Sequence, residues 1–412
     1  MSEANPGMER LIDIDALRGF ALFGVFGANL PLFSGLFYLP ETPMASGSLE
    51  SALAFARLWL VENKFMGLFS MLFGYSFWLF LRGLQARGER GYAPFFRRIF
   101  WLFLFGAIHG WLFWCWDILR FYALWALLLP LCLRASPVRL FFASWGLSLG
   151  VPAVVAAVGV LFAGASGVDG VETADAVGIA IDGALHAFSR GTFAEALQAN
   201  WQLDWAITLG WSQLAYQSTI FGHFLMGLAA ARYFGEAGPT AQPKLLLRIW
   251  WWTAPVGLAT ALISAMGWLH GGAEGAGLIA VFQTAHAAVL AELGNTALTL
   301  AWACGFLWLL TRPCVRPWLL ALAPAGRMAL SLYLLQSVLG LLMFYQWTGG
   351  PAWMGQWSEV RIAAWWFAGF ALQVWLANLW LRHHAQGPME WLWRSLTWWR
   401  LQSWRASARG KK

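Results

Sequence analysis

Residues 97–134, RRIFWLFLFGAIHGWLFWCWDILRFYALWALLLPLCLR, decide the fold. The stretch is almost wholly apolar, and it is long enough for two membrane crossings of about 18–20 residues each, joined by a tight turn. His109, Asp117 and Arg120 nevertheless lie within a dozen residues of one another. Titratable side chains are costly at membrane depth and commonly face a cavity or a partner, so we expect this hairpin to hold the functional site.

The rest of the chain has the composition of a membrane protein. Of its 412 residues, 59% are hydrophobic and only 11% are charged, whereas a soluble domain carries about 25% charged residues. A net charge of +7 is also typical of nucleic-acid-binding proteins, so the positions of the basic residues decide its interpretation. They gather in alternate loops and in the C-terminal tail, which is the distribution that sets membrane orientation. We therefore predict a polytopic membrane protein and no nucleic-acid partner.

Apolar runs bounded by charge, glycine or proline predict an all-α bundle of about ten spans around a central polar cavity. The expected spans are 16–35, 64–82, 97–114, 117–134, 138–163, 211–231, 246–268, 293–311, 318–345 and 360–381. The loop charges then place both termini in the cytoplasm of a bacterium and segment 164–204 outside its inner membrane. The four cysteines have no paired or metal-ligand spacing, and we expect no metal.

Two segments differ from the spans. Residues 274–292 are half polar, which is typical of a re-entrant or interfacial segment. Residues 382–412 form a basic, Trp-rich tail that follows the bundle of residues 1–381. Tryptophan interleaved with arginine at this position predicts a helix anchored in the anionic cytoplasmic leaflet, with membrane lipid as its partner.

The hairpin residues suggest acid–base chemistry. A carboxylate from Asp117 that accepts an imidazole N–H from His109 fixes the tautomer, and the other ring nitrogen is then free to act as a general base. The alternative is that His109 only hydrogen-bonds a neighbouring helix. Other polar residues of the spans are candidates to line the cavity, although each could equally bridge or anchor helices. They are Asn29, Arg120, Gln217, His223, His286, Arg327, Tyr333 and Gln336.

Several stretches, in order along the chain, resemble motifs of the YeiB-like membrane proteins. They are DIDALRGFALFGV (13–25), KFMGLFSMLFGYSF (64–77), GAIHGWLFWCWDILRFYAL (106–124), GRMALSLYLLQS (326–337) and GPMEWLWRSLTW (387–398). The sequence departs from the family pattern at Trp116, where glycine is usual, and at Leu332, where asparagine is common. The first departure is expected to crowd the Asp117 turn, and the second removes a polar contact.

The YeiB-like family is itself similar to the transmembrane acyltransferase superfamily, which includes heparan glucosaminide N-acetyltransferases and bacterial glycan O-acyltransferases. The resemblance implies that an acyl group, such as acetyl, moves from cytoplasmic acyl-CoA to a sugar or other envelope acceptor. It carries the catalytic histidine over to His109 and its acid to Asp117, and it makes a homodimer plausible. The basic loop with Arg82, Arg97 and Arg98 would then receive the phosphates of CoA.

Two other classes of function stay open at this point. A transporter or flippase would use the polar cavity to move a small metabolite or lipid without covalent chemistry. A structural or signalling protein would use its polar residues only to bridge helices.

Overall fold

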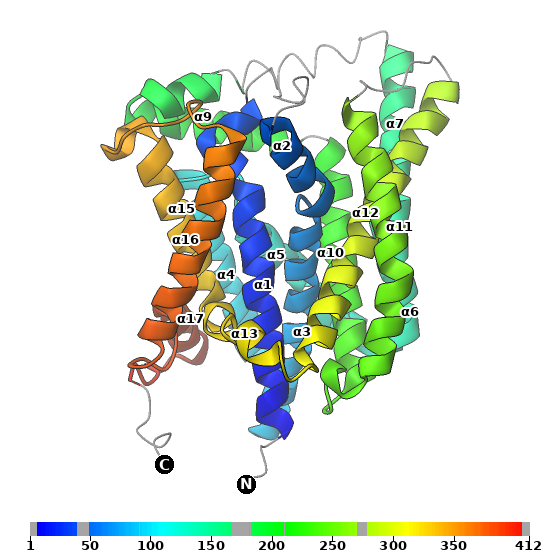
Figure 1. Ribbon diagram of the computed structural model, residues 1–412, viewed down its shortest axis with the longest axis vertical. Coiled ribbons are helices and arrows are strands. Elements are labelled where there is room, and N and C mark those ends of the chain that lie inside the picture. Colours follow the sequence, from blue (N-terminus) through cyan, green and yellow to red (C-terminus); the bar gives the residue numbers. More distant parts are fainter. Residues whose placement is uncertain are drawn as a thin grey trace.

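The computed structural model describes residues 6–38, 49–89, 91–166, 181, 183–209, 211–269 and 278–405 (Figure 1). Within these ranges every regular element is a helix, which confirms the all-α prediction. The helices of 20 residues or more are α1 (Pro6–Ser34), α3 (Lys64–Ala86), α4 (Ala93–Leu112), α10 (Trp211–Phe234), α11 (Pro243–Leu269), α12 (Leu278–Leu310) and α16 (Glu359–Trp380).

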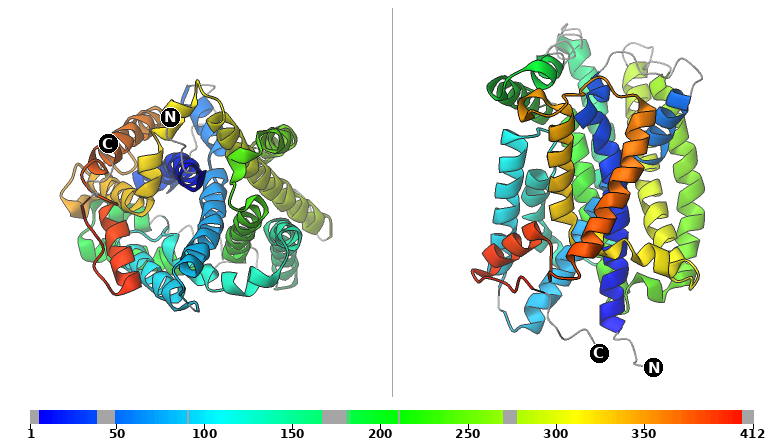
Figure 2. Two further views of the ribbon diagram at one scale, coloured as in Figure 1. Left: turned by 90° about the horizontal axis from the view of Figure 1, so that it is seen from below. Right: turned by 60° about the vertical axis from the view of Figure 1, so that its left-hand side comes forward.

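Shorter helices complete the bundle. They are α2 (Leu49–Leu60), α5 (Leu119–Ala126), α6 (Pro137–Trp145), α7 (Val151–Ser166), α9 (Phe193–Leu209), α13 (Arg316–Leu320), α14 (Ala323–Arg327), α15 (Ala329–Phe344) and α17 (Pro388–Trp398). Seen end-on, α1 lies inside a ring made by the other long helices (Figure 2).

Six segments of the described chain are long and apolar enough to cross a membrane, or seven if a bent helix pair is counted as one span. They are Ile12–Ser34, Leu49–Ala86, Pro137–Phe162, Pro243–Met266, Gln283–Leu310 and Glu359–Trp380. The count of about ten spans is therefore not confirmed. Helices α4 and α10 stand beside these spans (Figure 1), but the histidine and other polar residues of each lower its mean hydropathy.

Three expected segments differ from the structure. The span expected at 117–134 is the eight-residue α5 followed by a 3₁₀ turn over Leu129–Arg134, because Pro130 interrupts the α-helical ladder. The span expected at 318–345 is bent by 78° between α14 and α15. The expected re-entrant segment 274–292 is, from Leu278 onward, the unbroken start of α12, since no Gly or Pro interrupts it before residue 294. Residues 274–277 of that segment lie outside the described residues.

Glycines let the helices of the bundle approach each other backbone to backbone. A Cβ on Gly227 of α10 would lie 1.8 Å from the carbonyl oxygen of Met71, and one on Gly74 of α3 would lie 2.0 Å from that of Phe224. Gly326 of α14 meets the backbone of Asp15 in the same way, at 1.8 Å. Such contacts replace the hydrophobic driving force that is missing between helices in lipid.

The start of α1 and helix α17 lie at the same end of the bundle, and α9 lies at the opposite end (Figure 1). Of the segment expected outside the membrane, residues 167–180 and 182 are outside the described residues. Helix α17, in the tail that we expected on the membrane surface, packs against α4: the Trp393 indole N–H donates to the carbonyl oxygen of Arg98 at 2.8 Å.

Candidate functional site

The turn between α4 and α5 brings the two predicted catalytic side chains together. His109 lies on the last turn of α4, and its Nδ1 is 2.8 Å from Oδ1 of Asp117. Both side chains are buried. The second carboxylate oxygen accepts the backbone N–H of Arg120 at 3.1 Å. Because a carboxylate only accepts, Nδ1 of His109 carries the proton and Nε2 presents its lone pair.

Two glycines on α4 make room for this turn. A Cβ on Gly106 would lie 2.3 Å from the backbone nitrogen of Arg120 and 2.9 Å from Oδ2 of Asp117. A Cβ on Gly110, one helical turn later, would lie 3.2 Å from the Cβ atom of Asp117. The glycines share one face of the helix, so they form the groove into which the start of α5 packs.

Helix α9, at the end of the bundle opposite to α17, clamps the same turn (Figure 1). Its Asn200 side chain accepts the backbone N–H of Cys115 at 2.7 Å and donates to the carbonyl oxygen of Gly110 at 2.8 Å. One turn further, Asp204 forms a buried ion pair with the guanidinium of Arg120, with Nη1 and Oδ2 2.8 Å apart. Sequence reasoning missed Asn200 and Asp204, although their four-residue spacing on an amphipathic helix was an available signal.

His109 also lines a groove between α4 and α15. The groove has a volume of 560 Å³, and its walls are almost wholly apolar, with Phe105 and Ile108 from α4 and Leu334 from α15. Nε2 of His109 is buried and has no hydrogen-bond partner among the described residues. Since Nδ1 is engaged by Asp117, Nε2 is the ring nitrogen of His109 that is left without a partner.

A second cavity lies on the other side of the turn. It has a volume of 320 Å³, it is lined by Asn29, Asp117, Arg120 and Gln213, and it is the more polar of the two. The single central polar cavity that we predicted is therefore not confirmed. The hairpin turn instead stands between an apolar groove and a polar cavity, and Asp117 belongs to the wall between them.

Tyr333 is the third predicted residue at the pair. Its ring centroid is 5.5 Å from that of His109, and its hydroxyl donates to Oδ1 of Asp117 at 3.4 Å. Gln336, one turn later on α15, points elsewhere and donates to the side chain of Gln373 on α16 at 2.9 Å. Its role in the structure is to bridge two helices.

The other predicted cavity residues lie apart from the pair. Gln217 accepts the indole N–H of Trp125 at 2.8 Å. His223 is buried, and its Nδ1 donates to the carbonyl oxygen of Thr219 at 2.8 Å. His286 is exposed on α12. Arg327 is exposed, and its guanidinium donates to the carbonyl oxygen of Ala385, which lies shortly before α17.

The three predicted phosphate-binding arginines have different surroundings. Arg82 is exposed and forms an ion pair with Glu236. Nε of Arg97 is buried with no partner among the described residues. The guanidinium of Arg98 stacks on the ring of Trp393, 3.5 Å from its centroid.

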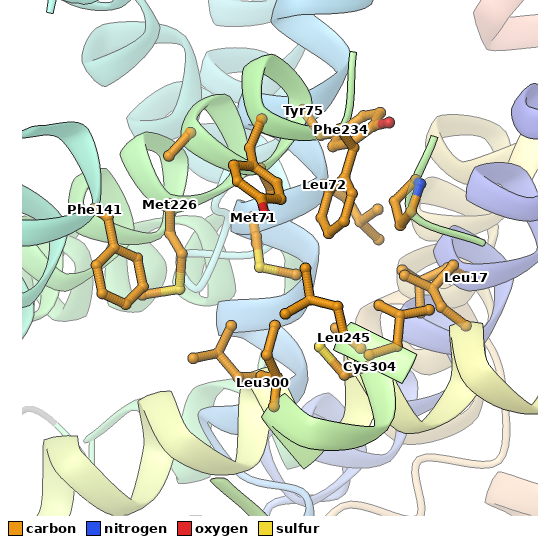
Figure 3. Close-up of a pocket in the computed structure, with 18 of the residues that line it drawn as sticks. Leu17, Met71, Leu72, Tyr75, Phe141, Met226, Phe234, Leu245, Leu300 and Cys304 are labelled. Carbon is orange, nitrogen blue, oxygen red and sulfur yellow. The ribbon is translucent and has the colours of Figure 1, made fainter. Parts of the chain in front are cut away.

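A third cavity, of 320 Å³, lies between α3, α6, α10, α11 and α12 (Figure 3). Side chains such as Met71, Met226, Phe234 and Leu300 line it with carbon and sulfur. Among the described residues, no charged side chain lines it. We assign no chemistry to this cavity.

Comparisons with known proteins identify the family. Residues 228–400 match a family described as a protein of unknown function, DUF418. The chain is 27% identical to the uncharacterized protein YxaH of Bacillus subtilis (strain 168), over 100% of both chains. It is also 27% identical to the uncharacterized protein YeiB of Escherichia coli (strain K12), over 95% of this chain and 97% of that one. These matches support a YeiB-like family for the chain.

A shorter match covers part of this YeiB-like chain. An uncharacterized 39.9 kDa protein in the amylase 3′ region of Bacillus acidopullulyticus is 42% identical over 101 residues, which are 24% of this chain and 28% of that one. No solved structure matches the YeiB-like chain.

Proposed function

We propose that this YeiB-like protein is a membrane-embedded acyltransferase. It would transfer an acyl group, such as acetyl, from acyl-CoA to a hydroxyl group of a sugar or other envelope acceptor. The observation that supports this is the buried His109–Asp117 pair: Nε2 of His109 has no hydrogen-bond partner among the described residues, and His109 lines an apolar groove. We place the protein in the bacterial inner membrane with both termini in the cytoplasm, which agrees with the common end of α1 and α17 (Figure 1).

In the His109–Asp117 pair, His109 can act as a general base and Asp117 orients its imidazole. The acceptor hydroxyl gives its proton to Nε2 of His109 while its oxygen attacks the carbonyl carbon of the thioester. Asp117 accepts the Nδ1–H and stabilises the imidazolium that forms. When the C–S bond breaks, the imidazolium returns the proton to the departing thiolate, and CoA leaves as a thiol. The acceptor keeps the acyl group as an ester.

The apolar walls strengthen this arrangement. Little water reaches the buried pair, so the attraction between the imidazolium and the carboxylate is screened less than it would be in solution. A positioned general base contributes about 10²–10⁴ in rate. Removing the imidazole alone should therefore lower the rate by about that factor while leaving the binding of the donor nearly unchanged.

The test uses the full chain purified in detergent, with acetyl-CoA as donor and water as acceptor. We expect saturable binding that raises the melting temperature, together with slow release of free thiol. His109→Gln should reduce thiol release by about 10²-fold or more. The matched control is His286→Gln, because that histidine is exposed and distant from the pair. A folded His109→Gln variant with the wild-type rate would contradict the mechanism.

Transport is the second candidate, and the polar cavity on the far side of the turn favours it. Asn29, Arg120 and Gln213 there offer hydrogen bonds to a small polar solute. In proteoliposomes, a solute that crosses unmodified without consumption of acyl-CoA would support transport. No binding of acetyl-CoA up to millimolar concentration by a folded sample would point the same way.

A further inference from the structure

We infer that Arg18, Arg98, Arg327 and Arg394 together form a phosphate-binding site at the α17 end of the groove that reaches His109. The ligand class is an amphiphile whose phosphate or diphosphate rests on these guanidinium groups while its chain follows the groove. This inference builds on the proposed function, because it states how an acyl donor would be held.

The first two arginines meet where α14 packs on α1. The guanidinium of Arg18 donates to the carbonyl oxygen of Gly326 at 3.3 Å and to Oγ of Ser76 at 3.0 Å. Arg327 directly follows Gly326, and its own guanidinium donates to the carbonyl oxygen of Ala385 at 3.1 Å. The chain segments that carry Arg18 and Arg327 are therefore in direct contact, although they are 309 residues apart (327 − 18).

The other two arginines meet where α17 packs on α4. Arg98 stacks on the ring of Trp393, and Arg394 is the next residue along the chain. Arg394 lies within electrostatic range of Glu390 and Asp15 as well as of Arg327 and Arg18, and Arg98 within range of Arg394, Arg18 and Glu390. Four helices that are distant in sequence thus bring four positive charges to one place.

The nearby carboxylates are already engaged. Asp15 forms an ion pair with Arg18 at 2.6 Å. Glu390 is buried and accepts the backbone N–H groups of Leu330 and Ser331, at 2.7 and 3.1 Å, so it caps the first turn of α15. In the described part of the chain, no carboxylate lies within 4.0 Å of the guanidinium groups of Arg98, Arg327 or Arg394. The set therefore carries more positive than negative charge.

An excess of guanidinium groups favours an anion. Like charges held close together repel one another, and an anion between them removes that repulsion. Guanidinium groups present paired N–H donors whose geometry matches the oxygen atoms of a phosphate. Because Met389 of the same helix as Arg394 lines the apolar groove, these donors suit a phosphate group that is attached to an apolar or extended chain.

The groove extends from the reacting pair to α17, the helix that carries Arg394. Met389 of α17 lines the groove, and it precedes Glu390 in the chain. Arg98 and His109 are 11 residues apart on α4 (109 − 98), which is about 16 Å along a helix. The extended pantetheine arm of CoA, between its diphosphate and its thioester, spans a comparable length.

The test measures binding by the full chain in detergent at one fixed ionic strength. The probes are CoA, inorganic diphosphate and pantetheine, which has no phosphate. We expect Arg394→Gln and Arg327→Gln each to weaken CoA and diphosphate binding about tenfold or more, since each removes a charged hydrogen-bond donor. Pantetheine binding should be unchanged. Arg361→Gln is the matched control, because Arg361 is exposed in the first turn of α16, beside α2 and outside this cluster.

The outcomes separate this inference from the proposed function. Wild-type affinity for CoA and for diphosphate in both folded Gln variants would overturn the phosphate site. Arg394-dependent binding of diphosphate without any His109-dependent thiol release would sustain the site and refute acyl transfer. If nanodiscs of phosphatidylglycerol compete for the site and CoA does not bind, the phosphate belongs to a lipid headgroup. Should Arg394→Gln fail to fold, Arg394→Lys keeps the charge and tests the paired geometry.

Discussion

At the scale of single residues, the site depends on the tautomer of one imidazole. His109 has a carboxylate on one ring nitrogen and nothing on the other among the described residues. The expected crowding of the turn by Trp116 does not occur. Its indole N–H donates to the hydroxyl of Tyr38 at 2.7 Å, and its ring meets that of Phe37, so it points away from the pair.

Asp117→Asn tests the tautomer directly. An amide can donate to Nδ1, which would move the imidazole proton to Nε2 and remove the base. We expect thiol release to fall about 10²-fold or more, with acetyl-CoA binding nearly unchanged. Tyr333→Phe is the control, since its bond to Asp117 is long at 3.4 Å and its loss should change the rate only a few-fold. A rate close to wild type in Asp117→Asn would show that the carboxylate has no such role.

At the scale of elements, two helices hold the hairpin and the groove in place. Helix α9 fixes the turn through Asn200 and Asp204, and α17 caps α15 through Glu390. Neither role was visible in the sequence, because both depend on partners about 60 to 90 residues away.

Because Asp204 of α9 holds the turn through its ion pair with Arg120, we expect Asp204→Asn to destabilise the protein. Removing one partner of a buried ion pair leaves the charge of Arg120 uncompensated, which costs about 3–5 kcal/mol. The melting temperature in detergent should fall accordingly. The double variant Arg120→Gln with Asp204→Asn should recover part of the loss, because no buried charge is then left alone. Strict additivity of the two single variants would contradict the pairing.

Because Glu390 both caps α15 and lies near Arg394, we expect Glu390→Gln to change stability and anion binding in opposite directions. Loss of the charged cap should destabilise the protein by about 1–2 kcal/mol, in the range of a helix N-cap. Anion binding should become tighter, because the same change removes a negative charge beside Arg394. Thermal melting and diphosphate affinity measure the two effects separately. Weaker diphosphate binding by the folded variant would speak against the phosphate site.

At the scale of the whole molecule, the proposed phosphate site and the His109–Asp117 pair lie at different depths of the bundle. Arg98 packs on Trp393 of α17, whereas the turn after His109 is held by Asn200 of α9. Helices α17 and α9 lie at opposite ends of the bundle (Figure 1). If the protein has the proposed orientation, the donor would enter from the cytoplasm and react near the outer side.

Native cysteines test that orientation. Cys314 is exposed between α12 and α13, at the same end as α17, whereas Cys115 and Cys304 are buried. In a Cys132→Ser background, a membrane-impermeant maleimide should label inside-out vesicles and spare right-side-out vesicles. Adding Cys314→Ser should abolish the label. Labelling of right-side-out vesicles would reverse the orientation.

The sequence by itself determined the class of the molecule and its central pair. Composition alone requires apolar helices, since an apolar backbone segment in lipid must satisfy its own hydrogen bonds. His109 and Asp117 are only eight positions apart in the sequence, so a tight hairpin is enough to bring their side chains together. Tertiary structure decided the rest. The cap by Glu390, the clamp by α9 and the contact of Arg18 with Gly326 each join segments far apart in the chain. Periodicity and local charge describe one segment at a time, so they do not specify which distant surfaces will meet.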